Sequence, residues 1–317
     1  MDGKIDSLLN NSNLECTVAC PMCGSQSLLE KFKVRHVCDD VQHSCGRDIG
    51  FATASVVSCR DCSFVFKPQR PSASYLENYY AHLGEGYLAS LAEDHREQRR
   101  DFQVASEALA KAFPKGGTIL EVGCASGFFL DSLGKSWNRF GIELFHLAAE
   151  QARSRNEITV HECDLQSAQF PAQSFDVVCC FDVIEHLPDP APLFSEARRI
   201  LKPSGWLLLG TGDCASLAAR AAGSRWTYLC IPEHISFFCS HSLKNGLTKA
   251  GFSHISFKRI HHGEISRSIA SGWLRAVSKH WAVNLFGPQI VQMRLFNQNT
   301  TDFLVPYFFD HLICFAM

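Results

Sequence analysis

The sequence lacks several features that would place it in a common class of protein. No apolar run approaches the roughly 20 residues that a helix needs to span a bilayer, and the polar residues 1–13 contain no signal-peptide core. The 317 residues also contain no internal repeat and no low-complexity segment. These absences predict a cytoplasmic globular protein that does not insert into membranes.

The chain also has no large excess of charge of one sign. The chain has 30 Lys and Arg residues against 32 Asp and Glu residues, and no long basic run. This balance argues against a protein that grips nucleic acid through its phosphates. With 46% hydrophobic and 20% charged residues, the chain can form a sizeable core, either as one large domain or as an ordinary domain plus a small module.

The fifteen cysteines are scattered along the chain, some of them in apolar runs, which is not the pattern of a secreted disulfide framework. Four form two matched Cys-x-x-Cys pairs, Cys20 with Cys23 and Cys59 with Cys62. Each pair makes a tight knuckle, and two knuckles supply the four thiolates that Zn²⁺ prefers, with no open position for a catalytic water. We predict a structural zinc site, the alternative being unrelated core cysteines. Nearby residues that could replace a ligand are Cys16, Cys38, Cys45, His36 and His43.

Residues 118–130 combine a short apolar run with a helical pattern, joined by a turn of small residues. The first part is typical of a buried strand, and the apolar spacing after Gly127 is typical of a helix. Gly123, Ala125 and Gly127 let the backbone approach a ligand closely, and a helix N-terminus presents N–H groups to it. This stretch alone is compatible with an ordinary strand-to-helix turn and with a nucleotide-binding turn.

From residue 118 onward, strand and helix patterns alternate, as in a parallel sheet with helices on both faces. Ligands of such folds bind at the carboxyl ends of the strands. The predicted strands and helices are 118–122, 139–142, 158–161, 175–181 and 206–210, and 128–135, 147–155 and 190–201, respectively.

Polar residues follow the second, third and fourth of these strands. Glu143 lies about 20 residues after the glycine turn, where a carboxylate can accept both hydroxyls of a ribose; a helix N-terminal acid is the alternative. Asp164 could accept a hydrogen bond from the exocyclic amine of an adenine, or be an ordinary loop acid. Asp182, Glu185 and His186 crowd the end of the fourth strand, although the helix start that follows could by itself explain polar residues there.

Several short motifs occur in a fixed order over residues 116–213. They are ILEVGCASG at 119–127, Glu143, Asp164, FDVV at 175–178, DVIEHL at 182–187 and LKPSG at 201–205. In order and interval they resemble the class I S-adenosylmethionine-dependent methyltransferases. Farther on, PEHISFFCSHSL at 232–243 and AGF at 250–252 are similar to the branch that carries an N-terminal zinc ribbon and acts on small molecules.

The resemblance implies an α/β fold: a Rossmann-like seven-stranded methyltransferase sheet with helices on both faces, plus a small N-terminal zinc ribbon. It implies S-adenosylmethionine as the cofactor. A dinucleotide site fits less well, because it does not predict Asp164 together with the Glu-His-Leu motif. The residues that would contact the cofactor are Glu121, Gly123, Cys124, Ala125, Gly127, Glu143, Leu144, Asp164, Leu165, Phe181, Asp182, His186 and Tyr80.

Two positions depart from the family's pattern. Ala125 stands where the family usually has glycine, so we expect a slightly fuller turn with cofactor binding retained. The segment 211–213, Thr-Gly-Asp, stands where relatives often have a proline-containing turn, which affects the expected geometry on the substrate side.

The chain divides into five predicted segments. The segments are a zinc-ribbon-like module over 1–70, a helical cap or linker over 71–115, the cofactor-binding core over 116–262, a helical insertion over 263–305 that is a lid or a dimer surface, and a returning edge strand of the core over 306–317. In the helical cap or linker, the charged residues around Arg99 and Arg100 mark a solvated helix face. The tyrosines of this segment serve helix packing or ligand contact.

The predicted reaction is methyl transfer to an oxygen or carbon atom of a small molecule such as a sugar, a nucleotide-sugar or another metabolite. Positioning and desolvation carry much of the rate, but a hydroxyl or acidic carbon must also lose a proton. We predict His234 as the general base and His186 as the second candidate, the alternative being that they merely order their loops. Another class of function is a non-catalytic module that binds S-adenosylmethionine or a partner. A homodimer is compatible with the sequence.

Overall fold

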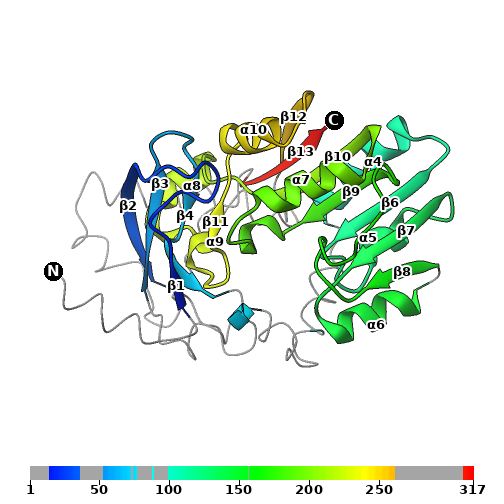
Figure 1. The fold of residues 1–317 in the computed structure, drawn as a ribbon, viewed down its shortest axis with the longest axis horizontal. Helices are drawn as coiled ribbons and strands as arrows, with labels where there is room; N and C mark the ends of the chain where they lie inside the picture. The colour runs from blue at the N-terminus through cyan, green and yellow to red at the C-terminus, as the bar shows by residue number, and fades with distance from the viewer. Residues whose placement is uncertain are drawn as a thin grey trace, which may run out of the picture.

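The structure of the protein is a computed structural model that describes residues 14–35, 53–72, 74–76, 88, 99–155, 157–260 and 310–317. These residues form a seven-stranded sheet, a four-stranded sheet and a two-stranded ribbon. Figure 1 shows the four-stranded sheet of the N-terminal part at one side and the seven-stranded sheet with its helices at the other.

The seven-stranded sheet has the order β12-β13-β10-β9-β6-β7-β8. Its strands are β6 (Gly117–Val122), β7 (Trp137–Ile142), β8 (Ile158–His161), β9 (Phe175–Phe181), β10 (Leu201–Gly212), β12 (Ile255–Ile260) and β13 (His311–Ala316). The five strands from β10 to β8 are parallel neighbours, whereas β13 is antiparallel to both β10 and β12. This arrangement confirms the predicted methyltransferase-type sheet.

Helices cover both faces of the sheet because its central strands are apolar on both sides. Ile119 and Leu120 are both fully buried, and they belong to different core clusters. The Leu120 cluster includes residues of α7 (Ala191–Ile200) and α10 (Ser240–Lys249), and the Ile119 cluster includes residues of α4 (Arg100–Ala112), α5 (Phe128–Ser132) and α6 (His146–Ser154). Two layers of helices therefore enclose the sheet.

The N-terminal part packs against the methyltransferase-type core. The sheet of β2 (Leu28–Arg35), β3 (Thr53–Cys59) and β4 (Val65–Phe66) is completed by β11 (Ser236–Phe237), which comes from the C-terminal half of the chain. The strand β1 (Leu14–Cys16) pairs with β5 (Gln69–Pro71). Lys67, which is fully buried, donates from Nζ to the Ile231 carbonyl at 2.7 Å. The division at residue 70 stays a prediction, and strand pairing crosses it.

The last strand corrects one expectation. The run ending the chain pairs with β12 as predicted, but it is not the edge of the sheet, because β13 lies between β12 and β10 (Figure 1). Leu312, Ile313 and Cys314 are almost completely buried, so this apolar strand gains more burial inside the sheet than at an edge.

Most predicted elements occur, with shifted ends. The strands 158–161 and 175–181 have the predicted bounds, whereas β10 is longer than predicted and α5 ends earlier. The predicted helical insertion 263–305 and Tyr80 lie outside the described residues. None of the helices in the described ranges is long and apolar enough to cross a membrane. Shorter elements complete the chain: η2 (Ile184–His186), α8 (Leu217–Ala222), η3 (Gly223–Arg225) and α9 (Thr227–Cys230).

Candidate functional site

A cavity of about 450 Å³ lies at the carboxyl ends of the parallel strands β6, β7, β8 and β9. Most of the residues predicted to contact a cofactor line it: Glu121, Gly123, Cys124, Ala125, Glu143, Leu144, Asp164, Leu165, Phe181, Asp182 and His186. Gly127 lies one turn away as the N-cap of α5 and does not line the cavity, and neither does His234. Tyr80 lies outside the described residues.

The turn between β6 and α5 forms one wall of this cavity. The N–H groups of Gly123 and Cys124 donate to the Ile142 carbonyl at 2.8 and 3.0 Å, which ties the turn to β7. Gly123 has a φ of +72°, and an added Cβ would lie 2.4 Å from Val183 Cγ2. Ala125 has a φ of +44°, so it keeps a left-handed conformation that favours glycine.

Glu143 at the end of β7 holds the turn from the opposite side. Its Oε2 accepts from the Ala125 N–H at 2.9 Å, and its Oε1 accepts from the Phe145 N–H at 2.8 Å. Burial raises the pKa of this carboxyl, although the backbone donors oppose the rise. Each carboxylate oxygen keeps a second lone pair, so Glu143 can still accept hydrogen bonds from a ligand in the cavity.

Glu121 contributes a carboxyl group from inside β6. Only 3% of the residue is exposed, and Oε2 has no hydrogen-bond partner among the described residues. Burial raises its pKa well above the usual range. A buried acceptor without a partner at a cavity wall suits a ligand that brings a hydrogen-bond donor or a positive charge.

Arg99 is a cavity residue that the sequence did not indicate. Its guanidinium pairs with both Asp101 and Asp182, and it stacks over the Phe102 ring with 4.5 Å between Cζ and the ring centroid. The interpretation of this arginine as part of a solvated face was wrong, because only 13% of its side chain is exposed. The charged residues around Arg99 in the sequence did not indicate that it lines a cavity, because its partner Asp182 is 83 residues away along the chain.

Asp164 lies at the cavity on the loop after β8. Its Oδ1 accepts from the Ser167 N–H at 2.6 Å, which closes a turn, and the residue is exposed. This observation is compatible with both sequence interpretations, the loop acid and the adenine acceptor. Leu165 beside it is buried, whereas Leu144 is 46% exposed at the cavity rim.

Behind the cavity lies a buried network that centres on Glu185. Tyr228 donates to Oε1 at 2.5 Å, and the Thr211 hydroxyl donates to Oε2 at 3.0 Å. Burial and the nearby charge of Asp182 raise the pKa of Glu185 to about 7. Thr211 stands where relatives often have a proline-containing turn. Its hydroxyl donates a hydrogen bond to Glu185 that a proline side chain could not make.

Replacing Glu185 with glutamine is expected to change how stability depends on pH. The folded protein holds the Glu185 proton up to about pH 7, whereas a free glutamate releases it near 4.5, so the free energy of unfolding falls as pH rises between these values. The gap corresponds to roughly 3 kcal/mol. Urea unfolding at about pH 5 and about pH 8 should show this fall in the wild type and a flatter profile in Glu185→Gln. The exposed Glu150→Gln variant is the control; an equal fall in all three proteins would contradict the assignment.

Two histidines meet beside Glu185. The His186 and His234 ring centroids are 4.8 Å apart, with His186 at the cavity and His234 behind it. His186 Nδ1 lies 3.2 Å from the Glu233 carbonyl and His234 Nδ1 lies 3.0 Å from the Tyr228 carbonyl. Since a carbonyl only accepts, these contacts assign the proton to Nδ1, and in a neutral ring Nε2 is then the basic nitrogen.

The protonation of His234 is set by its surroundings. Burial, then the charges of His186 and Lys67, lower the pKa of His234 well below its usual value, so the ring is neutral near pH 7. His311 behaves in the opposite way: burial lowers its pKa, but the hydrogen bond with Asp310 and the charge of Asp182 outweigh burial and raise it. Unlike His311, His234 is therefore held as a neutral base.

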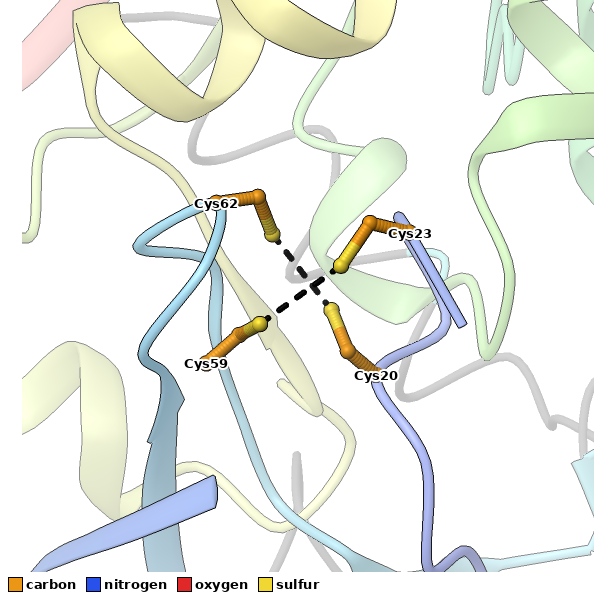
Figure 2. Close-up of side chains that lie close together, drawn as sticks. All are labelled: Cys20, Cys23, Cys59 and Cys62. Atoms are coloured by element: carbon orange, nitrogen blue, oxygen red, sulfur yellow. Dashed lines mark hydrogen bonds between the residues drawn. The ribbon is translucent and has the colours of Figure 1, made fainter. Parts of the chain in front are cut away.

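The four predicted zinc ligands converge in the N-terminal part. Figure 2 shows the Cys20 and Cys23 thiols pointing toward those of Cys59 and Cys62. The Sγ–Sγ distances are 3.5 Å in the crossed pairs, from Cys20 to Cys62 and from Cys23 to Cys59. Sulfurs at the corners of a zinc tetrahedron lie about 3.8 Å apart, so the cluster needs only a small expansion to hold the ion.

The substitutes considered for these ligands do not replace them in the structure. Cys16 is exposed on β1 and is not part of the cluster. His36, Cys38, His43 and Cys45 lie outside the described residues.

A second group with metal-ligand spacing consists of Glu185, His186 and His234, whose ligand atoms lie within 4.8 Å of one another. Both Glu185 oxygens already accept hydrogen bonds, and the Lys67 charge acts on His234, so this group suits proton transfer better than a cation.

Comparison with known protein families identifies the family to which the chain belongs. The model of the methyltransferase domain family matches residues 94–256, which is just over half of the chain. The chain belongs to this family. It is an S-adenosylmethionine-dependent methyltransferase, and the cavity at the carboxyl ends of β6 to β9 is where its fold binds ligands.

Curated relatives of this methyltransferase match it over a limited region. The ubiquinone biosynthesis O-methyltransferase of Hydrogenovibrio crunogenus is 34% identical over 101 residues, which cover 30% of this chain and 42% of the relative. The enzyme of the same name from Neisseria meningitidis serogroup C is 32% identical over 108 residues, covering 31% and 44%. The methyltransferase thus spans less than half the length of the curated relatives that it matches.

A solved structure shares the fold of this methyltransferase. It belongs to the complex between the Haloferax volcanii Trm112 methyltransferase activator and a methyltransferase, with a TM-score of 0.51. The match is 18% identical and covers 76% of this chain and 96% of that one.

Proposed function

We propose that this methyltransferase moves the methyl group of S-adenosylmethionine to a hydroxyl oxygen of a small molecule. The observation that carries the proposal is the His186–His234 pair, in which His186 lines the cavity and offers a base to an acceptor bound there. The names of the curated relatives support oxygen over carbon as the acceptor atom. A non-catalytic module would have no use for a neutral imidazole beside a cofactor cavity.

The cavity residues fit the cofactor. Glu121 Oε2, which has no hydrogen-bond partner in the part of the chain that the structure describes, would accept from the cofactor's ammonium group, and the Gly123 to Gly127 turn would face its amino-acid end. Glu143 would accept from the ribose hydroxyls and Asp164 from the adenine amine. When bound, S-adenosylmethionine supplies an electrophilic methyl group on a sulfonium.

The protein's own contribution to the chemistry is proton removal and positioning. His234, predicted as the general base, does not line the cavity, so we propose instead that the cavity-facing His186 accepts the hydroxyl proton at Nε2. His234, kept neutral by burial, lies against it as the second base. Glu185 holds the Tyr228 side chain, whose ring centroid lies 4.1 Å from that of His234, and so fixes the ring's position. These groups place the base before the acceptor arrives.

The Cys20, Cys23, Cys59 and Cys62 cluster is proposed to hold a structural Zn²⁺. Its support is the convergence of four sulfurs from two knuckles (Figure 2). The backbone N–H groups of Cys62 and Asp61 outweigh burial and lower the pKa of Cys59 to about 7, which favours the thiolate that metal binding needs. Four protein ligands leave the ion no catalytic position.

Calorimetry with S-adenosylmethionine and transfer of a labelled methyl group to a panel of hydroxylated metabolites test the function. We expect cofactor binding and label in at least one acceptor class. Gly123→Ala should weaken cofactor binding about tenfold or more, because its Cβ would strike Val183 and strain the turn. Gly134→Ala is the matched control: its φ of +77° imposes similar strain, but no described atom lies within 4 Å. Cofactor binding with no transfer to any class would contradict the function, and no binding would favour a partner-binding module.

A further inference from the structure

Two half-buried cysteines, Cys214 and Cys239, lie beside each other at the two ends of one segment of the chain. Cys214 directly follows the isolated bridge residue Asp213 after β10, and Cys239 is the N-cap of α10. Neither lines the cofactor cavity, and neither belongs to the zinc cluster. The reaction proposed above makes no use of them.

The backbone places the two residues in register. Asp213 pairs with Phe238 in a parallel bridge, and the Cys214 N–H donates to the Phe238 carbonyl at 2.8 Å. In a parallel bridge the next residues along the two segments are neighbours, so Cys214 lies beside Cys239. Adjacent strands lie about 4.7–4.9 Å apart, which falls within the Cα separation of about 4.4–6.8 Å found in disulfides.

The surroundings of Cys239 favour its thiolate. Its Sγ lies 3.6 Å from the Ser242 hydroxyl and receives the N–H of the first turn of α10. The Cys214 thiol, within hydrogen-bonding reach, is the largest cause that lowers the pKa of Cys239 to about 5, followed by the donors of α10 outweighing burial. This same contact, followed by burial, raises the pKa of Cys214, so one sulfur is a nucleophile and the other a protonated neighbour.

We propose that Cys239 is a peroxide-reactive thiolate and that Cys214 resolves its oxidation by forming a reversible disulfide. The Cys239 thiolate attacks hydrogen peroxide, which breaks the O–O bond, leaves a sulfenic acid on Cys239 and releases hydroxide. The Cys214 sulfur then attacks the Cys239 sulfur. The S–O bond breaks, the S–S bond forms, and water leaves with the Cys214 proton, so two thiols are oxidised by one peroxide.

The disulfide would close the segment that carries part of the candidate site. Between the two cysteines lie α8, α9 and β11, including Tyr228, Glu233 and His234. Reduced, the two ends of this segment are joined to each other by the Asp213–Phe238 bridge and the hydrogen bond from the Cys214 N–H to the Phe238 carbonyl; oxidised, they are also covalently joined, which restricts opening of the segment. The proposal does not rest on the proposed methyl transfer, since it needs only the two thiols.

The test is peptide mapping of the zinc-loaded full chain after treatment with one equivalent of hydrogen peroxide. We expect a peptide pair joining Cys214 to Cys239, two hydrogen masses lighter than the reduced peptides, and its loss after dithiothreitol. In Cys214→Ser, a sulfenic acid on Cys239 should accumulate and be trapped by dimedone, because the resolving thiol is gone. In Cys239→Ser, neither the disulfide nor dimedone labelling at residue 214 should occur.

Cys163→Ser is the matched control, a half-buried cysteine outside this pair whose removal should leave the disulfide unchanged. The wild-type result stands even if a variant fails to fold. The proposal is overturned if Cys163 or the zinc-cluster cysteines oxidise while Cys239 stays reduced, or if Cys239 pairs with another cysteine in place of Cys214.

Discussion

Replacing His234 with alanine is expected to lower kcat by about 10²–10⁴ with affinity for S-adenosylmethionine unchanged. The ring does not line the cavity proposed for the cofactor, so its loss removes the second base without removing a proposed cofactor contact. His186→Ala should lower kcat by a similar factor, because its ring borders both the cavity and His234. Because we propose that the two rings act as one unit, the double variant should be no slower than the slower single variant.

The matched control is His241→Ala, which removes an exposed histidine on α10. Steady-state kinetics with the acceptor found by label transfer, together with calorimetry on each variant, separate turnover from binding. The lowered pKa of His234 adds a pH signature: this ring stays neutral below the usual histidine range, so the difference in turnover between the wild type and His234→Ala should persist to lower pH than an ordinary histidine permits. Unchanged turnover in His234→Ala, with cofactor bound, would contradict its role.

Replacing Cys59 with serine is expected to abolish zinc binding and to destabilise the whole protein. A structural zinc site contributes folding free energy on the order of 10 kcal/mol, and a serine cannot replace the lost thiolate. The loss would spread, because Cys20, Cys59 and Met22 belong to the same buried cluster as Phe194 on α7 and Leu247 on α10. The N-terminal knuckles therefore help to build the core that supports the cofactor cavity.

Metal analysis of the purified chain should give about one zinc per molecule in the wild type and none in Cys59→Ser. Thermal unfolding should show a large fall in Tm for this variant, and a chelator should lower the Tm of the wild type. Cys16→Ser is the control, since Cys16 is a nearby exposed cysteine that is not part of the cluster. A metal-free wild-type protein that is fully folded would overturn the zinc proposal.

The sequence predicted which residues meet around one cavity because the signals for these residues are local. A strand, a small-residue turn and a helix follow one another within 118–130, and the acids Glu143 and Asp164 come directly after strands. In a parallel sheet the carboxyl ends of neighbouring strands share one edge, so residues at those ends meet without further information. Eleven of the predicted contact residues line one cavity for this reason.

Contacts between distant segments could not be predicted in the same way. Nothing local to Arg99 indicates that it pairs with Asp182, and nothing in the Tyr228 segment shows that its hydroxyl meets Glu185. Neither Arg99 nor Tyr228 belongs to a periodic pattern or a motif from which its partner could be predicted. Their positions follow from how helices and loops pack over the sheet, which depends on the whole core.

By itself, the sequence determined which residues stand at the ends of the predicted parallel strands and which four cysteines form the two knuckles of the proposed zinc site, since positions along the chain give both. Only the tertiary structure decided that β13 lies inside the sheet, that β11 completes the N-terminal sheet, and that Cys214 faces Cys239. The physical reason is that pairing between distant strands is chosen by the total burial and hydrogen bonding of the folded chain, which no single segment encodes.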